Sequence, residues 1–321
     1  MAVYTEVPDD ELEVFLARYD VGAVMSCKGI AEGVENTNYL VHAEKGSFIL
    51  TLYEKRVDPD DLPFFISLLE HLSRNGVTCP EPLRDRDGNA LSRLCGRPAA
   101  LMTFLEGLSP RHPEPPHCRE VGAALARMHK AAADFSGDRP NALSVADWRP
   151  IYAAVADRAD TVAPGLAAEM ETELAVLEAN WPEGLPEGII HGDLFPDNVF
   201  FFEDRVSGMI DFYFACRDAL AYDVAVCLNA WCFEADLTFN VTKGRELLGG
   251  YVSGRPLSQA EVKALPLLAR GAAMRFFVTR LYDLINHPPG AFVRPKDPLE
   301  YAKRIRCHRR VSCASEYGLG L

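Results

Sequence analysis

Apolar and polar residues alternate in short runs over the first hundred residues, a pattern that predicts β-strands around one long amphipathic helix. Residues 39–42 and 48–53 flank a turn at 44–47 and predict a β-hairpin. Apolar residues at helical spacing predict a helix over 60–75 that ends at Gly76. These elements predict a small α+β lobe on an antiparallel sheet. The other elements expected in this lobe are a helix at 9–19, short strands between 80 and 97, and a last strand at 97–104.

Helical spacing dominates after residue 107. The segment 109–117 is rich in proline and is expected to form a surface loop, and one strand-like island, residues 188–211, interrupts the helices. We therefore expect a larger, mainly helical lobe over 104–321, joined to the first lobe, residues 1–103, by a hinge at 103–107. Helices are expected around 121–128, at 149–160, 166–180, 219–234 and 240–252, and at 259–286, where Pro266 should separate or kink the first turn.

Composition narrows the class of protein. The chain has 321 residues and a formal net charge of −13, so we expect it to repel nucleic acids and anionic membranes. Its nine cysteines are an odd number without a C-x-x-C pair, which favours reduced thiols over a secreted disulfide framework. The sequence has no basic leader segment and no run of 18 apolar residues, so we expect a cytoplasmic protein without a membrane span.

Three oxygen-bearing side chains stand where the apolar strands of the island end. An apolar run leads through a His-Gly dipeptide into Asp193, a short loop ends at Asn198, and Asp211 follows a second apolar run. Such a carboxylate can accept a hydroxyl proton, and an amide oxygen with a second carboxylate can hold Mg²⁺. Phosphoryl transfer needs both functions. The simpler interpretation, in which Asp193 and Asp197 form turns and Asp211 caps a helix, does not explain the joint pattern.

The spacing matches the kinase pattern H-x-D-x-x-x-x-N followed by a D-F-G-like aspartate. The sequence thereby resembles the aminoglycoside-phosphotransferase-like family, a branch of the protein-kinase-like fold whose catalytic loop reads H-G-D. The resemblance implies a two-lobed kinase that uses ATP and Mg²⁺. It implies that Asp193 is the catalytic base and that Asn198 and Asp211 hold the metal ion. It also implies structural support of the site by His191 and Asp223.

A candidate phosphate-binding segment precedes the predicted hairpin. Gly29 and Gly33 lie four residues apart, which lets a loop approach phosphates closely, and Lys28 adds a positive charge. A glycine pair of this kind is equally typical of an ordinary tight hairpin. Its place before the strand pair, where the kinase-like fold has its phosphate-covering loop, favours the nucleotide-binding role. The side chains of Asn36 and Asn38 are candidate donors to phosphate or substrate.

The resemblance also places the interlobe hinge, and one departure from the wider family is visible. Backbone groups of Thr103, Phe104 and Leu105 are expected to line the adenine pocket. The family usually carries a strand lysine paired with a helix glutamate, but Thr51 and Phe65 stand at these positions. Joint loss of both partners avoids an uncompensated charge. The remaining candidates for a cation at the phosphates are Lys28, Lys55 and Arg56.

Residues 29–39, 48–56 and 211–225 narrow the resemblance to the bacterial homoserine kinases built on this fold. This likeness covers nearly the whole chain and agrees with the missing strand lysine. It implies ATP-dependent phosphorylation of the homoserine side-chain hydroxyl, a step of threonine biosynthesis. The P-loop pattern G-x-x-x-x-G-K-[ST] is absent from the sequence, which excludes a P-loop kinase. The alternatives are a kinase of the same family for an aminoglycoside, choline or a thio-sugar, and a non-catalytic nucleotide-binding module.

A small zwitterionic acceptor needs a cation for its carboxylate and an acid for its ammonium group, and bidentate arginine suits a carboxylate well. The helix expected at 259–286 offers three arginines, of which Arg275 and Arg280 join Asn36 and Asn38 as candidate substrate-binding residues. Solvated helix charges are the simpler interpretation of each such residue. The third arginine is Arg270, and the acidic candidates for the ammonium group are Glu234, Asp236 and Asp283.

Overall fold

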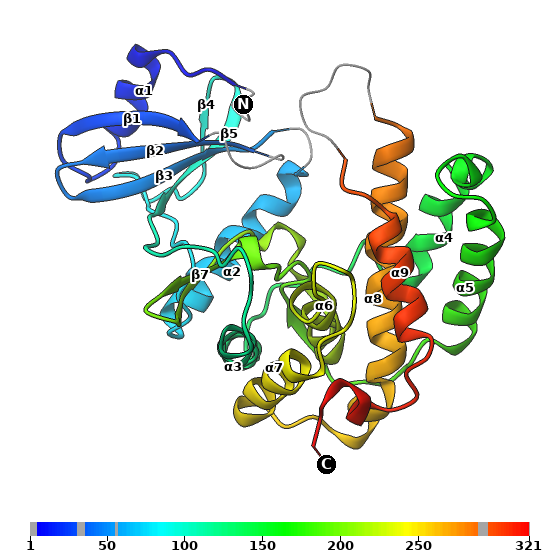
Figure 1. The fold of residues 1–321 in the computed structure, drawn as a ribbon. Coiled ribbons are helices and arrows are strands. Elements are labelled where there is room, and N and C mark those ends of the chain that lie inside the picture. The colour runs from blue at the N-terminus through cyan, green and yellow to red at the C-terminus, as the bar shows by residue number, and fades with distance from the viewer. Residues whose placement is uncertain (1–4, 31–35, 55–56, 288–294, 321) are drawn as a thin grey trace.

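A computed structural model describes residues 5–30, 36–54, 57–287 and 295–320. Within them the chain forms two lobes, with the antiparallel sheet of the N-terminal lobe above a larger helical lobe (Figure 1). This arrangement confirms the predicted α+β, two-lobed, protein-kinase-like fold. The sheet has the strand order β1-β2-β3-β5-β4. Its strands are β1 (Val24–Ile30), β2 (Thr37–Ala43), β3 (Gly46–Leu52), β4 (Ser92–Leu94) and β5 (Arg97–Thr103).

The predicted hairpin is present as β2 and β3, but the strand before it was not predicted. β1 pairs antiparallel with β2, so that Lys28 lies opposite Leu40 and Gly29 opposite Tyr39. It is an edge strand with no buried residue, and its sequence therefore lacks the alternation that marks a half-buried strand. Between residues 80 and 97 the expected strands reduce to β4 and a single bridge from Pro82 to Met102.

The two faces of the sheet belong to different hydrophobic cores. Successive residues of a strand point to opposite faces, and in β5 Leu101 packs with α1 (Asp9–Leu16) while Ala100 and Met102 pack with α2 (Leu62–Arg74). The α2 side continues into the core of the C-terminal lobe, whereas the α1 side is a separate cluster. The lobes are therefore joined through the α2 face of the sheet.

The C-terminal lobe places two short hairpins among its helices. In the first, β6 (Glu187–Ile190) pairs with β9 (Cys216–Ala219), and in the second, β7 (Val199–Phe202) pairs with β8 (Arg205–Met209). None of the helices in the described ranges is long and apolar enough to cross a membrane. The helices are α3 (Pro115–Ala131), α4 (Val145–Ala153), α5 (Leu166–Asn180), α6 (Leu220–Trp231), α7 (Val241–Gly254), α8 (Gln259–Ile285) and α9 (Leu299–His308).

Helix α8 runs without a break through Pro266, contrary to the expected separation of its first turn. The start of the helix is held by a capping box in which the Ser258 amide donates to the Glu261 carboxylate over 2.8 Å and the Glu261 amide donates back to the Ser258 hydroxyl. Pro266 is itself buried in the core. Capping and packing therefore outweigh the hydrogen bond that proline removes.

Helices α3 and α7 approach so closely that their contact requires glycine. A Cβ atom at Gly122 would lie 2.0 Å from the Leu247 carbonyl oxygen, and one at Gly250 would lie 2.0 Å from the Arg119 carbonyl oxygen. Both obstacles are backbone, which cannot move out of the way as a flexible side chain does. The close approach also brings Tyr251 on α7 to the residues of α3.

We expect Gly250→Ala to lower the thermal unfolding midpoint, because the added methyl group overpacks the α3–α7 contact at a cost of about 1–3 kcal/mol. The neighbouring Gly249→Ala is the matched control, since its Cβ would meet only the tip of the Arg119 side chain at 3.5 Å. Alanine is the better helix former by up to about 1 kcal/mol, so Gly249→Ala should unfold at the same or a higher temperature. Equal midpoints for the two variants would contradict the close approach.

Candidate active site

The loop His191–Asn198 connects the two hairpins of the C-terminal lobe. It begins where β6 ends at Ile190 and stops where β7 begins at Val199. β8 pairs with β7 and delivers the chain to Asp211, directly before the turn Phe212–Phe214 that leads to β9. The pairing of β6 with β9 and of β7 with β8 thus returns residue 211 to the loop.

Hydrogen bonds tie Asp193 to Asn198, and tie Ile210, the residue before Asp211, to the same loop. The Asn198 side-chain amide donates to the backbone oxygen of Asp193 over 2.8 Å and to its carboxylate over 3.3 Å. Ile210, next to Asp211, donates its N–H to the Asn198 carbonyl over 3.0 Å. Its own carbonyl accepts from Nε2 of His191 at 3.0 Å. The structure therefore brings residues 193, 198 and 211 together at one place.

His191 is fully buried and has both ring nitrogens engaged within this site. Nε2 donates to Ile210, and Nδ1 accepts the backbone N–H of Asp193 at 3.3 Å. The ring also packs against Phe212 at 4.6 Å between centroids. Burial lowers the pKa of His191 and keeps the ring neutral. A neutral ring with one donor and one acceptor matches both of its partners, so His191 holds the loop to the strand end of β8.

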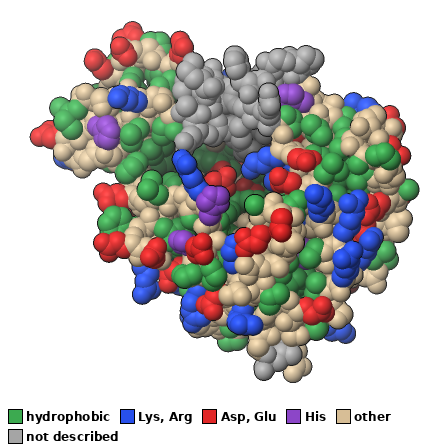
Figure 2. Space-filling view, in the orientation of Figure 1, with side chains coloured by type: hydrophobic (Ala, Val, Ile, Leu, Met, Phe, Trp, Pro, Cys, Tyr) green, Lys and Arg blue, Asp and Glu red, His purple; other side chains and the backbone are tan. Residues whose placement is uncertain are grey.

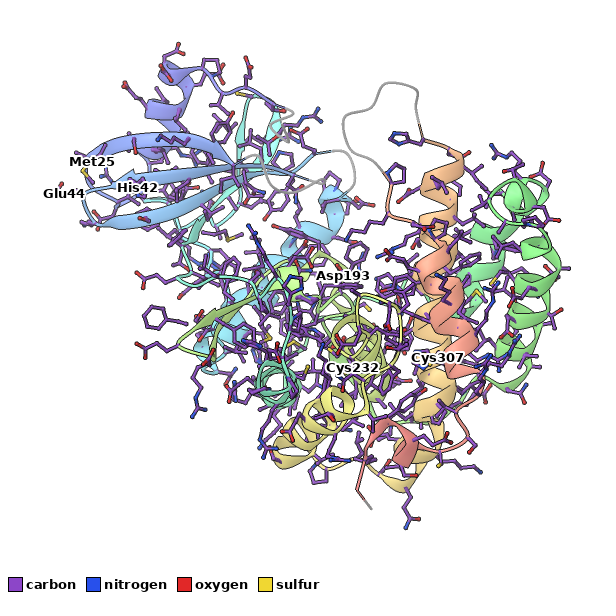
Figure 3. The ribbon with its side chains drawn as sticks, viewed as in Figure 1. Met25, His42, Glu44, Asp193, Cys232 and Cys307 are labelled. Carbon is purple, nitrogen blue, oxygen red and sulfur yellow. The ribbon has the colours of Figure 1, made fainter. Side chains whose placement is uncertain are left out.

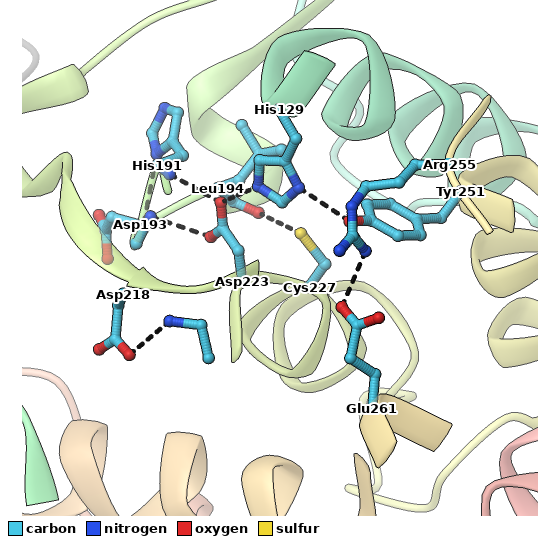
Figure 4. A network of polar contacts seen from close by, with 12 residues as sticks. His129, His191, Asp193, Leu194, Asp218, Asp223, Cys227, Tyr251, Arg255 and Glu261 are labelled. Atoms are coloured by element: carbon cyan, nitrogen blue, oxygen red, sulfur yellow. Dashed lines mark hydrogen bonds and ion pairs between the residues drawn. The ribbon is translucent and has the colours of Figure 1, made fainter. Parts of the chain in front are cut away.

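Asp223 on α6 is a buried acceptor for the start of the loop (Figure 4). Its carboxylate accepts the backbone N–H of His191 at 2.7 Å and that of Gly192 at 2.9 Å, and Nε2 of His129 at 3.1 Å. Burial by itself raises the pKa of Asp223, but the hydrogen bond and charge of His129 and the other donors outweigh it, and the pKa is lowered. A lowered pKa means that Asp223 stabilises the fold above the ordinary pKa of a carboxyl group and loses this effect as the pH falls through its folded pKa.

The hydrogen-bonded chain continues away from Asp223 through residues that the sequence did not single out (Figure 4). The Tyr251 hydroxyl lies 2.9 Å from Nδ1 of His129 and accepts from Arg255 at 3.1 Å, and Arg255 pairs with the buried carboxylate of Glu261 at 2.8 Å. Four helices, α6, α3, α7 and α8, thus contribute to one polar chain that ends at the catalytic loop. Of this polar chain, Asp223 was predicted as a supporting residue, through the family resemblance.

The predicted nucleotide-side residues are described only in part. Lys28 and Gly29 lie exposed on β1, whereas Gly33, Lys55 and Arg56 lie outside the described residues. Thr103 ends β5, and Phe104 and Leu105 follow it, with Phe104 42% exposed.

The asparagines expected to face phosphate or substrate have partners inside the N-terminal lobe. The Asn38 side-chain oxygen accepts the Thr51 hydroxyl at 2.8 Å, and the Asn36 side-chain oxygen accepts the backbone N–H of Glu54 at 3.3 Å. Thr51, which stands at the family's lysine position, is therefore a hydrogen-bond partner of the neighbouring strand.

Aromatic rings connect the N-terminal sheet and helix at Phe65, the residue expected at the family's glutamate position. Phe65 on α2 packs edge-on against Tyr213 with centroids 5.6 Å apart, and Tyr213 packs in the same way against Tyr53, which directly follows β3, also at 5.6 Å. Tyr213 belongs to the turn that follows Asp211. This trio links the N-terminal sheet and helix to the turn beside the metal-binding candidate through ring contacts and through a hydrogen bond of 3.4 Å between the hydroxyls of Tyr213 and Tyr53.

Comparison with known proteins agrees with this geometry. Residues 26–257 match the model of the phosphotransferase enzyme family. The homoserine kinases of Parvibaculum lavamentivorans and Rhodospirillum rubrum are each 62% identical to the chain and covered, like the chain, to 99%. The chain belongs to this phosphotransferase family, among its homoserine kinases. Solved structures of a spectinomycin phosphotransferase with ADP and spectinomycin (TM-score 0.70, 13% identity, 98% of both chains) and of choline kinase from Cryptosporidium parvum (TM-score 0.67, 14% identity, 94% and 95% of the two chains) share the fold.

The side-chain oxygen atoms of the phosphotransferase site are of the kind that binds the Mg²⁺ of a magnesium nucleotide. The two hydrogen bonds from Nδ2 of Asn198 to Asp193 turn its side-chain oxygen away from Asp193. Oxygen donors alone suit Mg²⁺, which is held by few carboxylates together with water and phosphate oxygens. Among the described residues, no group of three or more His, Cys, Asp and Glu side chains is placed to hold a metal ion without such help. Asn198 and Asp211 therefore fit a metal that arrives with its nucleotide.

The arginines of the phosphotransferase's long helix differ in surroundings. Arg275 is 3% exposed, donates to the Gly192 carbonyl of the catalytic loop and lies over the Phe214 ring at 5.3 Å. Arg280 pairs with Glu300 of α9 at 2.8 Å. The other residues predicted to contact the acceptor have partners of their own or are exposed. Arg270 pairs with Glu173 and Glu234 with Lys243. Asp236 accepts the Thr238 hydroxyl, and Asp283 is exposed.

We expect Asp223→Asn to unfold at lower urea concentration and to reduce kcat at least tenfold. An amide cannot accept from all three donors, and a broken buried charged pair costs about 3–5 kcal/mol. Asp218→Asn is the control, because among the described residues this half-exposed carboxylate of β9 accepts only the Asn141 side-chain amide and the neighbouring Ala219 N–H, each at 2.6 Å, and the substitution should cost less than about 1 kcal/mol. A kcat for Asp223→Asn within twofold of the Asp218→Asn value would contradict the loop-holding role.

Proposed function

We propose that the chain transfers the γ-phosphoryl group of ATP to the side-chain hydroxyl of L-homoserine, giving O-phosphohomoserine and ADP in threonine biosynthesis. The observation that carries this proposal is the hydrogen-bonded convergence of Asp193, Asn198 and the chain preceding Asp211. Full-length similarity to homoserine kinases supports the acceptor. Since ATP and an intermediate of amino-acid biosynthesis are its substrates, we propose that it works in the cytoplasm, with neither nucleic acid nor membrane as a partner.

In this mechanism Asp193 orients the homoserine hydroxyl and accepts its proton. The hydroxyl oxygen bonds to the γ-phosphorus as the bond from phosphorus to the β,γ-bridging oxygen breaks, and ADP leaves. The hydrogen bond from Asn198 holds one carboxylate oxygen of Asp193 in place. Asn198 and Asp211 would hold Mg²⁺, which when bound neutralises phosphate charge.

The nucleotide is proposed to bind between the lobes, with residues 1–103 above and 104–321 below. Thr103, Phe104 and Leu105 would line the base pocket at the junction of β5 with the C-terminal lobe. Gly29 and Gly33 would approach the phosphates from the hairpin of β1 and β2, and Lys28 on β1 is the described cation on that side. The proposed contacts to the acceptor remain Asn36, Asn38, Arg275 and Arg280. Arg275 would act indirectly, because it donates to the backbone of the catalytic loop.

The acceptor is tested by measuring ADP release under identical ATP and Mg²⁺ with L-homoserine, choline, an aminoglycoside and a thio-sugar. We expect kcat/KM for L-homoserine to exceed the others by at least a hundredfold, and chelation of the metal by EDTA to abolish turnover. A higher kcat/KM for another alcohol would show that homoserine is not the preferred acceptor. Nucleotide binding without ADP release for any acceptor would support the non-catalytic module.

Asp193→Asn should bind nucleotide with unchanged affinity and lose turnover by at least a thousandfold, because an amide does not accept the hydroxyl proton. The control is Asp197→Asn, which removes the exposed carboxylate of the same loop and should keep turnover within about threefold. Both are read from nucleotide titration and single-turnover rates. Retained turnover in Asp193→Asn would rule out its role as the base.

A further inference from the structure

A row of aromatic rings leads from the catalytic loop to the last long helix. Phe195, two residues after Asp193, packs on Phe276 of α8 with centroids 5.0 Å apart, and Phe276 packs on Tyr301 of α9 at 5.2 Å. Figure 3 shows Asp193 below the sheet, toward the paired helices α8 and α9. The row of rings therefore connects the catalytic loop to the contact between these two helices.

Positive charge gathers around this row. Arg280 and Arg304 each lie 4.5 Å from the centroid of the Tyr301 ring, and the Lys296 ammonium lies 5.7 Å from that of Phe195. Glu300 is the carboxylate that pairs with Arg280. We name Phe195, Phe276, Arg280, Lys296, Tyr301 and Arg304 the α8–α9 cluster. In a chain of net charge −13, a local excess of cations next to a catalytic carboxylate marks a place for an anion.

Two polar atoms of the cluster are buried without a hydrogen-bond partner in the described part of the chain. They are the hydroxyl of Tyr301 and Nε of Arg304. An unsatisfied buried donor costs about 1–3 kcal/mol. Both atoms are donors, and each is able to donate to an oxygen atom of an anion, while Nη1 of Arg304 donates to the Asn229 carbonyl over 2.7 Å.

We propose that the α8–α9 cluster binds the α-carboxylate of the amino-acid acceptor, with the Tyr301 hydroxyl donating to it and Arg280 and Arg304 balancing its charge. The inference rests on the proposed function, which it extends to the recognition of the acceptor. An extended homoserine spans about 5 Å from hydroxyl oxygen to carboxylate carbon, at about 1.5 Å per bond. A homoserine whose hydroxyl group lies at Asp193 therefore places its carboxylate within about 5 Å of that hydroxyl, so the group that binds the carboxylate must lie close to the catalytic loop.

Three further observations support this reach. Burial is the main reason why the pKa of Tyr301 is raised; Arg304 and Arg280 oppose the rise, and the charge of Asp193 adds to it, so the base acts electrostatically on this phenol. The cluster also reaches solvent through its cations, since the Arg280 side chain is 13% exposed and Lys296 lies at the surface. In the space-filling view a hollow between the lobes contains acidic side chains with Lys or Arg on both sides (Figure 2).

The decisive experiment crosses one hydroxyl deletion with one carboxylate deletion. Tyr301→Phe removes only an oxygen that has no partner in the described structure, so the variant should fold with an unchanged unfolding midpoint. Its kcat/KM for L-homoserine should fall about 10- to 100-fold, mainly through KM, as expected for a hydrogen bond to a charged group. For 3-aminopropan-1-ol, which keeps the hydroxyl and amine but lacks the carboxylate, the value should change less than twofold. Where its turnover is below detection, its inhibition constant against homoserine is compared instead.

Tyr19→Phe is the matched control. The Tyr19 hydroxyl is also buried and without a hydrogen-bond partner among the described residues, but it lies in the separate core of the N-terminal lobe. This variant should have unchanged kcat/KM values for both L-homoserine and 3-aminopropan-1-ol. Arg304→Gln is a second test that does not depend on Tyr301→Phe folding, and it should show the same selective loss for homoserine.

Two results would overturn the inference: equal losses of Tyr301→Phe and Arg304→Gln for both substrates, which indicate a structural role, or no loss for either. Failure of the proposed function looks different, because the unchanged protein itself would then not phosphorylate homoserine. In that case the acceptor has no established carboxylate for the cluster to bind, and the inference fails together with the proposed function. If the unchanged protein phosphorylates homoserine but the variants lose activity equally on both substrates, the result contradicts this inference and leaves the proposed function intact.

Discussion

The active site depends on a buried carboxylate that is not itself part of the chemistry. Asp223 accepts the backbone N–H groups of His191 and Gly192, and so fixes the peptide units from which Asp193 projects. A charged acceptor inside a protein is stable only where donors surround it, and here the third donor is His129 on another helix. The catalytic loop is therefore anchored to the packing of α3, α6 and α7, and its geometry is as rigid as that packing.

From this anchor the order of the site propagates along the chain. His191 and Asn198, at the two ends of the loop, hold the carbonyl and the N–H of Ile210, and Asp211 follows with φ +64°, a left-handed conformation that aspartate tolerates better than most residues. The next turn carries Tyr213 to the rings of Phe65 and Tyr53. The lobes are thus joined here by packed rings and by a hydrogen bond of 3.4 Å between the hydroxyls of Tyr213 and Tyr53. An ion pair between Asp61 and Arg139 at 2.7 Å adds a polar contact between the lobes.

The sequence was informative where local pattern and chemistry coincide. The hairpin at 39–53, the helix at 60–75 and the triad Asp193, Asn198 and Asp211 follow from short-range periodicity and from spacing along one strand-loop-strand segment. β1 could not be predicted, because an edge strand without a buried residue has no apolar alternation to detect. His129 and Tyr251 could not be predicted for another reason: they reach Asp223 through contacts more than ninety residues apart in sequence, and a single sequence read by itself holds no signal for such pairs.

An acidic kinase must bring a polyanionic nucleotide, and an acceptor with its own carboxylate, to a site that already contains Asp193 and Asp211. Uniform positive charge over the surface would answer this need but would also attract unrelated polyanions. This chain instead keeps its net charge at −13 and places cations beside the loop in contact with aromatic rings: Arg275 between Phe214 and Phe276, and Arg280 and Arg304 on Tyr301. Ring faces stabilise a cation without neutralising it, and low local dielectric strengthens its field over a few ångströms while solvent screens it beyond. These cations lie beside the catalytic loop, at the place where we propose that the carboxylate of the acceptor binds.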